Sequence, residues 1–260
     1  MGISRSTLYY QPKQPAKDWK LKQEIEKTLS EHHSYGHKRI AVHIQRNKKA
    51  VLRVMNIYGL RPYKRRKRYR KTKTEDLSDK YPNLLLREDV FPSYPNHIWT
   101  SDFTYLRHKN KFVYLATVLD IFTREIVGYS VLTSHNSQLV INALLNAVSD
   151  HSLPLILHSD QGSEYVSKDY LNLVKSMNIS TSLSHKGCPW ENGYQESFYS
   201  QFKIDLGDPN QFDSLGELVY NIYRTIHSYN NKRIHSVLKM PPAMFAERSK
   251  TQRSPCVNRV

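Results

Sequence analysis

The sequence predicts an α/β protein in which a mixed five-stranded sheet with flanking helices follows a small all-α region. Residues 1–60 show only helical periodicity, whereas from Ile98 onward β-type segments alternate with amphipathic helices. The hydrophobic content of 39% is sufficient for a packed core. We therefore divide the chain into a helical region (1–60), a basic linker or arm (61–95), an α/β core (96–212) and a C-terminal helical extension (213–260).

Three short helices are expected in the first region. Residues 18–33 place apolar side chains at helical spacing, and residues 38–46 repeat the pattern briefly. Asn47 is expected to cap a third helix, which ends at Gly59. A basic third helix is typical of a helix-turn-helix module, in which Lys48, Lys49 and Arg53 would contact DNA. The alternative is a small helical bundle with a solvated basic face.

The positive charge of the chain is concentrated at one end. Residues 1–80 hold 22 Lys and Arg against 7 Asp and Glu, whereas residues 81–260 hold 17 against 16. Such segregation favours a polyanionic partner at that end. Membrane phospholipid is the rival of nucleic acid, but no basic amphipathic helix with a Trp/Phe face accompanies the charge. We therefore expect DNA as the partner.

The densest charge lies in residues 61–73, where nine of thirteen side chains are basic. Against phosphates, Arg65, Arg66, Lys67 and Arg68 would release several counterions together, and a solvated tether is the alternative. Two tyrosines in this segment, Tyr63 and Tyr69, could stack on bases.

Membrane insertion and secretion are not indicated. The chain has no apolar run near 18 residues, and Met1 is followed by GISRSTLYY rather than by a signal-peptide core. Its two cysteines, Cys188 and Cys256, can build neither a disulfide framework nor a zinc cluster. We expect a cytoplasmic protein.

The order of elements defines the core more closely. Three strands are expected at 98–106, 111–120 and 124–132, the first two as a hairpin, followed by helix 135–150, strand 154–160, helix 167–178, strand 179–184 and helix 191–206. This is the order of a ribonuclease H-like domain. We expect Asn192 and Gln195 to form a capping box at the start of the last helix.

Three carboxylates occupy suggestive positions in this order. Asp102 lies in the middle of the first strand, Asp160 ends the strand 154–160, and Glu196 sits early in the last helix, with 35 residues between Asp160 and Glu196. Three carboxylates can hold two Mg²⁺ ions about 4 Å apart and leave positions open for phosphate and water. Each acid taken alone is more often a cap or a surface charge.

Longer motifs make the assignment specific. HSDQGSEY, KGCPWENGYQESFYSQFK and YNNKRIHSVLKMPPAMF resemble the integrase-like transposases of bacterial insertion-sequence family three, and the resemblance runs from about Ser34 to Phe245. It implies a ribonuclease H-like core with Asp102, Asp160 and Glu196 as catalytic metal ligands. It also implies Mg²⁺ or Mn²⁺, cleavage at the ends of the element, and transfer of the 3′-hydroxyl to target DNA.

Further residues near the carboxylates have two readings each. Lys203 lies two helical turns after Glu196 on the same face, which suits a grip on phosphate; an ordinary exposed lysine is the alternative. Asn192 would lie beside Glu196 and the DNA, or only cap the helix. His158 would touch substrate or make a structural hydrogen bond, and we read Asp120 as a structural turn residue.

The sequence departs from retroviral integrases at one point. His32, His33 and His37 have no paired cysteines nearby, so we expect no zinc there. The resemblance implies that a separate upstream reading frame supplies a further helix-turn-helix and a leucine zipper, and we expect a homo-oligomer on DNA. Two other functions stay open at this stage: a non-catalytic regulator that binds element ends, and a hydrolytic nuclease of ribonuclease H type.

Overall fold

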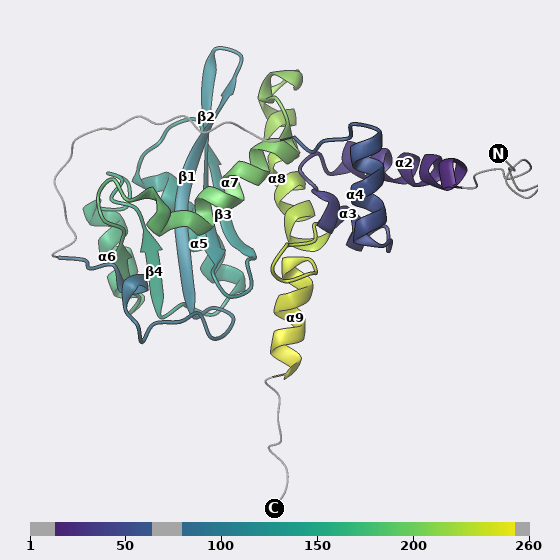
Figure 1. Cartoon of the computed structure of the whole chain (residues 1–260). Coiled ribbons are helices and arrows are strands. Elements are labelled where there is room, and N and C mark those ends of the chain that lie inside the picture. Colours follow the sequence, from purple (N-terminus) through teal and green to yellow (C-terminus); the bar gives the residue numbers. More distant parts are fainter. Residues whose placement is uncertain (1–13, 64–79, 253–260) are drawn as a thin grey trace, which may run out of the picture. The chain divides into compact units, whose positions relative to one another are not determined.

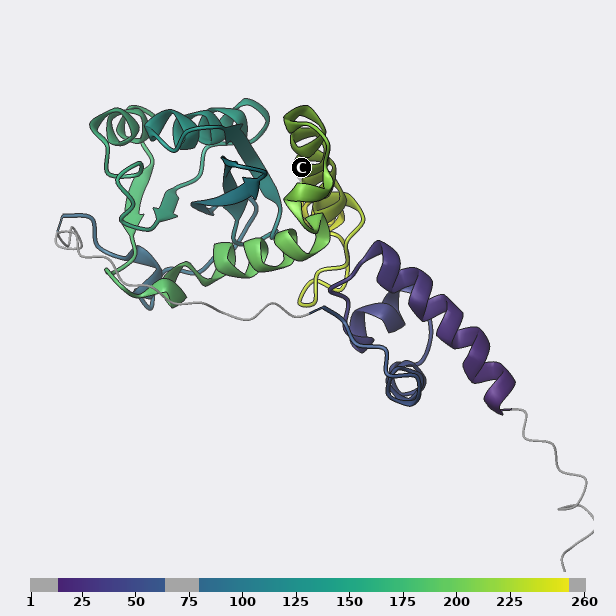
Figure 2. The same ribbon diagram turned by 90° about the horizontal axis from the view of Figure 1, so that it is seen from above.

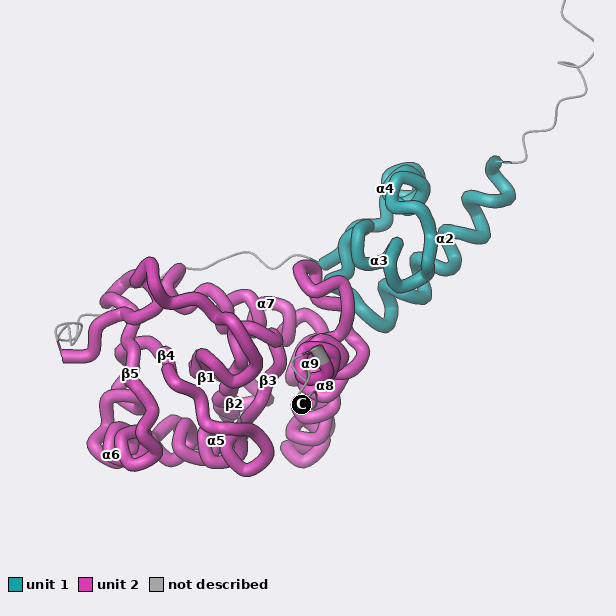
Figure 3. Tube along the Cα trace, turned by 90° about the horizontal axis from the view of Figure 1, so that it is seen from below, with its two compact units in different colours: residues 1–64 teal, residues 65–260 magenta. Residues whose placement is uncertain are grey.

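The computed structural model describes residues 14–63 and 80–252. The chain divides into two compact units, residues 1–64 (unit 1) and residues 65–260 (unit 2), which are coloured separately in Figure 3. The predicted DNA contacts Arg65, Arg66, Lys67 and Arg68, together with Tyr69, lie outside the described residues. Within the described part, no helix has the length and apolarity needed to cross a membrane.

Residues 14–63 of unit 1 form a bundle of three helices, as their periodicity predicts: α2 (Gln14–Glu31), α3 (His37–His43) and α4 (Lys48–Ile57). Ile25 from α2, Ile40 from α3 and Val54 from α4 are fully buried together in its core. The predicted cap of the third helix is confirmed, because the Asn47 side chain accepts a hydrogen bond of 2.8 Å from the Lys49 backbone N–H.

Unit 2 contains the sheet and the remaining described helices (Figure 1). In chain order its strands and α-helices are β1 (Ile98–His108), β2 (Lys111–Asp120), β3 (Ile126–Leu132), α5 (Ser137–Asp150), β4 (Ile156–Ser159), α6 (Lys168–Ser176), β5 (Ser180–Leu183), α7 (Gly193–Leu206), α8 (Leu215–Asn231) and α9 (Pro242–Gln252). Short 3₁₀ turns occur at Leu84–Leu86, Pro189–Asn192 and Pro209–Gln211.

The sheet has five strands in the order β3-β2-β1-β4-β5. β1, β2 and β3 are antiparallel, whereas β4 runs parallel to β1 and β5 runs parallel to β4. This confirms the predicted mixed sheet and its ribonuclease H-like order. α5 and α6 cover one face of the sheet and α7 covers the other, as the view in Figure 2 shows.

A hydrophobic core lies on each side of the sheet. Alternation along β2 sends Ala116 and Val118 toward α5, and Leu115 and Leu119 toward α7. α8 contributes Ile222 and its neighbours to the second core. One of the predicted C-terminal helices therefore packs with α7 on this face of the sheet. Side chains of β1 and β4 that point toward α7 therefore lie on the same face of the sheet as this second core.

Candidate active site

The pairing of β1 with β4 brings two of the predicted carboxylates to the same level. The strands are parallel, and Thr100 of β1 stands opposite His158 of β4. Asp102 follows Thr100 by two residues and Asp160 follows His158 by two residues. Because side chains two residues apart share a face, Asp102 points from the sheet toward the α7 side. Asp160 is the residue after the end of β4, and its charge contributes to the raised pKa of Asp102.

The third carboxylate comes from α7, which is attached to the sheet by buried hydrogen bonds. Gln195 is fully buried; its amide donates to the backbone oxygens of Thr100 at 2.6 Å and Thr117 at 3.2 Å. The hydroxyl of Tyr199, one turn further, donates to the backbone oxygen of Asp102 at 2.6 Å. Glu196 follows Gln195 directly, so these bonds set its height above β1.

The predicted capping box is wrong. Asn192 makes no side-chain cap for α7; its carboxamide oxygen instead accepts a 2.6 Å hydrogen bond from the Thr100 hydroxyl. Gln195 likewise reaches the sheet rather than the helix start. Both side chains are buried under α7, where bonds to the sheet replace those that an exposed helix end would make to itself. Asn192 thus faces β1, the side away from solvent.

Glu196 and Lys203 occupy the accessible part of the same helix. Glu196 is exposed, and Lys203 is half-buried with its ammonium 5.5 Å from the centre of the Tyr105 ring. The carboxylates of Asp102, Asp160 and Glu196 do not all lie within 4.8 Å of one another, so the triad forms an open cluster in the described structure. Its members interact through charge.

Burial and mutual repulsion of the acids change the pKa values in this cluster. Burial and the charges of Asp160 and Glu196 raise the pKa of Asp102 well above its usual range, while the backbone N–H of Phe103 and the ammonium of Lys203 act in the opposite direction. Burial also raises the pKa of Asp160, against the hydrogen bond that it accepts from the Gly162 backbone. A cation beside these groups would relieve the repulsion.

Two further predicted residues have structural roles. His158 is buried and its Nδ1 lies 2.9 Å from the Ser182 hydroxyl; burial lowers the pKa of its imidazole to about 4. Asp120 is also buried, and its carboxylate accepts hydrogen bonds from the backbone N–H groups of Phe122, at 2.7 Å, and Asn96. The reading of Asp120 as a turn residue agrees with these bonds.

The candidate DNA contacts of unit 1 differ in their surroundings. Lys48, Lys49 and Arg53 are all exposed on α4. The Arg53 guanidinium nevertheless donates a 2.6 Å hydrogen bond to the carboxylate of Asp18 in α2. A contact between Arg53 and a base would have to replace this ion pair. Lys48 and Lys49 form no ion pair with a described residue.

Sequence reasoning missed the residues that hold the segment before α7. Glu191 accepts hydrogen bonds of 2.7 Å from the side chain of Asn83 and from the backbone N–H of His185. The backbone N–H of Leu84 donates to the Ser182 hydroxyl on β5 at 2.9 Å. The end of the predicted linker is therefore fastened to the sheet. The only signal in the sequence was that Glu191 lies within the motif KGCPWENGYQES.

In this ribonuclease H-like sheet, two adjacent parallel strands position two aspartates, and the helix that covers them carries a glutamate. This arrangement defines the integrase class of catalytic core. Residues 92–189 match one family model described as "Integrase core domain", and residues 177–242 match a second with the same description.

Proteins with similar sequences are transposases. The transposase for insertion sequence element IS904 of Lactococcus lactis is 35% identical over 84% of this chain and 89% of its own length. The putative transposase InsK for IS150 of Escherichia coli is 32% identical over 91% of this chain and 87% of its own length. The chain belongs to the integrase-like transposases of insertion-sequence family three, DDE-type enzymes that catalyse DNA cleavage and strand transfer.

One solved structure extends the likeness in fold. A chain in the intasome of simian T-cell lymphotropic virus, in complex with the PP2A regulatory subunit B56 gamma, superposes with a TM-score of 0.52 and 17% identity. The match covers 90% of this chain and 76% of that one.

The family membership favours a transposase over both a non-catalytic regulator and a ribonuclease H-type nuclease.

Proposed function

We propose that Asp102, Asp160 and Glu196 bind two divalent cations, Mg²⁺ or Mn²⁺, and with them cleave and join DNA at the ends of an insertion sequence. The observation that carries this is the convergence on one face: β1 and β4 bring the aspartates level, and α7 places Glu196 over them.

The donor set fits such ions. All three ligands offer carboxylate oxygens, which hard cations such as Mg²⁺ and Mn²⁺ prefer. The raised pKa of Asp102, caused by burial and by its acidic neighbours, marks a cluster with unbalanced negative charge. Two bound ions supply activation of the attacking water or 3′-hydroxyl and stabilisation of the leaving oxygen.

The protein's own groups hold the reacting parts in place. Gln195 and Tyr199 fix α7 on β1, which keeps Glu196 above Asp102. Lys203 lies two turns beyond Glu196, about 10 Å along the helix, which is too far to share an ion but suits the next phosphate of a bound strand. Its ammonium would orient the scissile phosphate, a role for which small misplacements cost large factors in rate.

Substitution of the carboxylates tests the assignment. Asp102→Asn, Asp160→Asn and Glu196→Gln are each expected to abolish cleavage and joining and to leave folding and DNA binding nearly intact, since groups that share metals act as one unit. The assay incubates purified protein with labelled element ends and Mg²⁺, and separates joined products, nicked products and mere complexes. Wild-type joining by any one variant would remove that residue from the site.

The assay also distinguishes the remaining alternatives. Nicked products without joining would indicate a hydrolytic nuclease, and stable complexes without cleavage would indicate a regulator. Asp120→Asn is the matched control, because that carboxylate is buried in a turn and makes backbone hydrogen bonds there. It is expected to retain the joining rate of the folded protein. Addition of the upstream-frame product would show whether this chain acts unaided.

We further propose that unit 1 and the basic arm bind the element ends. The exposed Lys48 and Lys49 at the start of α4 support contact with DNA, with Arg53 available only if its bond to Asp18 opens. Replacing Arg65–Arg68 by Ala is expected to make the plot of log affinity against log salt concentration less steep. The slope should change by roughly 0.9 for each phosphate contact that is lost. An unchanged slope would reduce the arm to a tether. Cross-linking on DNA would reveal the expected homo-oligomer.

A further inference from the structure

Three potential metal ligands meet inside unit 1. Glu31 is the last residue of α2, His32 follows it directly, and His43 is the last residue of α3. Their ligand atoms all lie within 4.8 Å of one another. We propose that this cluster binds a divalent transition-metal ion, Zn²⁺ in the first instance, independently of the carboxylate triad in unit 2.

The chemistry of the set suits zinc. Two imidazole nitrogens and one carboxylate oxygen form a recognised three-ligand zinc set that leaves the fourth position to water. Tetrahedral ligands about 2 Å from the ion lie about 3.3 Å apart, so the three groups need to close by roughly an ångström or two. Rotation of side chains supplies such a movement. Imidazole suits Mg²⁺ poorly, which separates this cluster from the triad.

Ring contacts connect both imidazoles to a buried core residue, Tyr35. The His32 ring stacks on the fully buried Tyr35, with 4.4 Å between ring centres and 14° between ring planes. The His43 ring stands edge-on to His32 at 5.5 Å and to Tyr35 at 6.1 Å. The His32 backbone N–H donates to Thr28 at 2.8 Å. The two rings are therefore close together before an ion binds, which reduces the side-chain ordering that binding requires.

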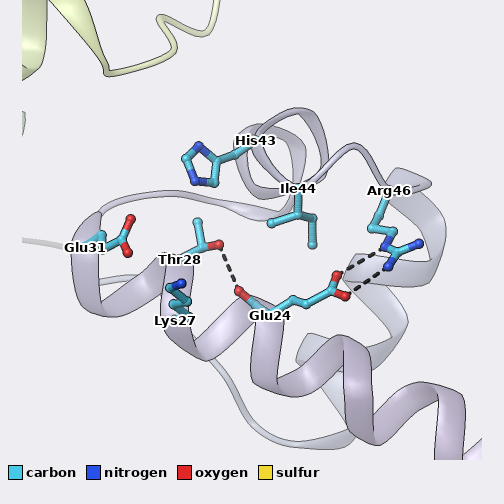
Figure 4. Close-up of a pocket in the computed structure, with 7 residues that line it drawn as sticks. All are labelled: Glu24, Lys27, Thr28, Glu31, His43, Ile44 and Arg46. Atoms are coloured by element: carbon cyan, nitrogen blue, oxygen red, sulfur yellow. Dashed lines mark hydrogen bonds and ion pairs between the residues drawn. The ribbon is translucent and has the colours of Figure 1, made fainter.

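The cluster opens onto a pocket whose lining carries charges of both signs, with Lys27 among its basic residues. Glu31 and His43 line one end of a pocket of about 380 Å³ between α2 and α3, and Glu24 and Arg46 line the other end (Figure 4). The Arg46 guanidinium donates to both carboxylate oxygens of Glu24, at 2.9 and 3.1 Å, which balances its charge. The Glu31 carboxylate makes no hydrogen bond or ion pair with any described residue.

The histidines for which no zinc was expected are not the ones that form this cluster, apart from His32. That expectation rested on the absence of cysteines near His32, His33 and His37. The fold instead brings in His43, eleven residues after His32, and leaves His33 and His37 out of the cluster. An ion here would tie the end of α2 to the end of α3, the pair on which α4 packs. Since the unfolded chain lacks the site, binding would stabilise unit 1.

The test uses untagged full-length protein in which Asp102→Asn, Asp160→Asn and Glu196→Gln remove the other proposed metal site. Titration with Zn²⁺ in excess Mg²⁺ is expected to show one bound ion per chain, and Co²⁺ in its place is expected to give the absorption of a four-coordinate site. Adding His43→Ala is expected to lower the Zn²⁺ affinity by more than the roughly 10- to 100-fold that loss of an outer-shell partner costs.

Two further variants keep the result interpretable. Glu31→Gln removes the carboxylate charge without changing shape, so it covers the case in which His43→Ala fails to fold, as judged by circular dichroism. His33→Ala removes an exposed histidine beside the cluster and is expected to leave Zn²⁺ binding unchanged. Failure to bind stoichiometric Zn²⁺, displacement by Mg²⁺, or an equal loss in His33→Ala would each overturn the proposal. Activity is not part of this readout.

Discussion

The α5 face and the α7 face of the sheet differ in what holds the helix against the strands. On the α5 face, packing is mainly apolar and close: a Cβ on Gly128 would lie 2.4 Å from the backbone oxygen of Ala143 and 2.5 Å from the Cβ of Ala147. One hydrogen bond of 3.0 Å, from the backbone N–H of Tyr129 to the side chain of Asn146, accompanies it. On the α7 face, an apolar core is supplemented by the buried side chains of Gln195 and Tyr199, which donate hydrogen bonds to backbone oxygens of β1 and β2.

The difference matters for the proposed site, which lies on the α7 face. Apolar contacts are non-directional and stabilise any arrangement that excludes water. Hydrogen bonds require particular distances and angles, so they fix the position of the helix along its axis. Glu196 comes from α7 and Asp102 from β1, and their relative position therefore depends on these bonds. Substitutions on the α5 face should alter stability alone, whereas those on the α7 face should alter stability and activity together.

The largest effect on stability is expected from Gln195→Glu. This change keeps the shape of the side chain but turns a donor into a carboxylate beside the Thr100 and Thr117 carbonyl oxygens, in a fully buried position. An uncompensated buried charge costs about 3–5 kcal/mol. The urea midpoint should fall accordingly, and less at low pH, because the folded state binds a proton more readily than the unfolded state once the carboxyl is buried.

Ser200→Glu adds the same charge at an exposed position of α7 and is the control. Its stability should change by no more than about 0.5 kcal/mol. Equal midpoints for the two variants would show that the polar contacts under α7 contribute nothing to stability.

The sequence predicted the elements well because their signals are local. Periodicity located the three helices of unit 1 and the strands of unit 2, and Asn47 was correctly predicted as a cap. The motifs, rather than periodicity, singled out Asp102 and Asp160 among many acids. Their proximity, Asp102 on β1 and Asp160 just after β4, follows from the pairing of these two strands, which the linear sequence does not contain.

The failures occurred where local and tertiary partners compete. Asn192 and Gln195 have the residue types and spacing of a capping box, and an isolated helix would use them so. In the folded chain both are buried against β1, where unsatisfied carbonyl and hydroxyl groups need partners. His43 near Glu31 is a similar case, because the contact depends on the angle between two helices.

The next largest effect is expected from Gly128→Ala on the apolar face. The new Cβ would collide with the backbone of α5, and overpacking of this kind costs about 1–3 kcal/mol. The joining rate per folded molecule should not change, since no proposed active-site residue is involved. Gly216→Ala is the control: its Cβ meets only the Ser214 hydroxyl at 3.8 Å. A joining defect in folded Gly128→Ala protein would contradict the separation of the two faces.

Tyr199→Phe should produce a smaller loss of stability with a disproportionate loss of activity. It removes the hydroxyl that donates to the Asp102 backbone and accepts from Thr117 at 2.9 Å, worth about 0.5–1.5 kcal/mol. Tyr229→Phe removes a comparable bond, 3.0 Å to the Arg124 backbone, from α8. Chemical unfolding should place the two variants close together, and the joining assay should separate them. Equal joining rates would mean that α7 is positioned by packing alone.

The smallest effect on stability, but a strong one on joining, is expected from Lys203→Ala. The side chain is half-buried beside Tyr105, and its removal should change stability by no more than about 0.5 kcal/mol. If its ammonium positions the scissile phosphate, joining should fall on the order of 100-fold while the Mn²⁺ requirement stays the same. Lys203→Arg should restore part of the rate, because it keeps the charge but changes its geometry. Lys175→Ala, at an exposed position of α6 on the opposite face, is the matched control and should join normally. A raised Mn²⁺ requirement with normal affinity for DNA ends would place Lys203 in metal binding rather than in phosphate positioning.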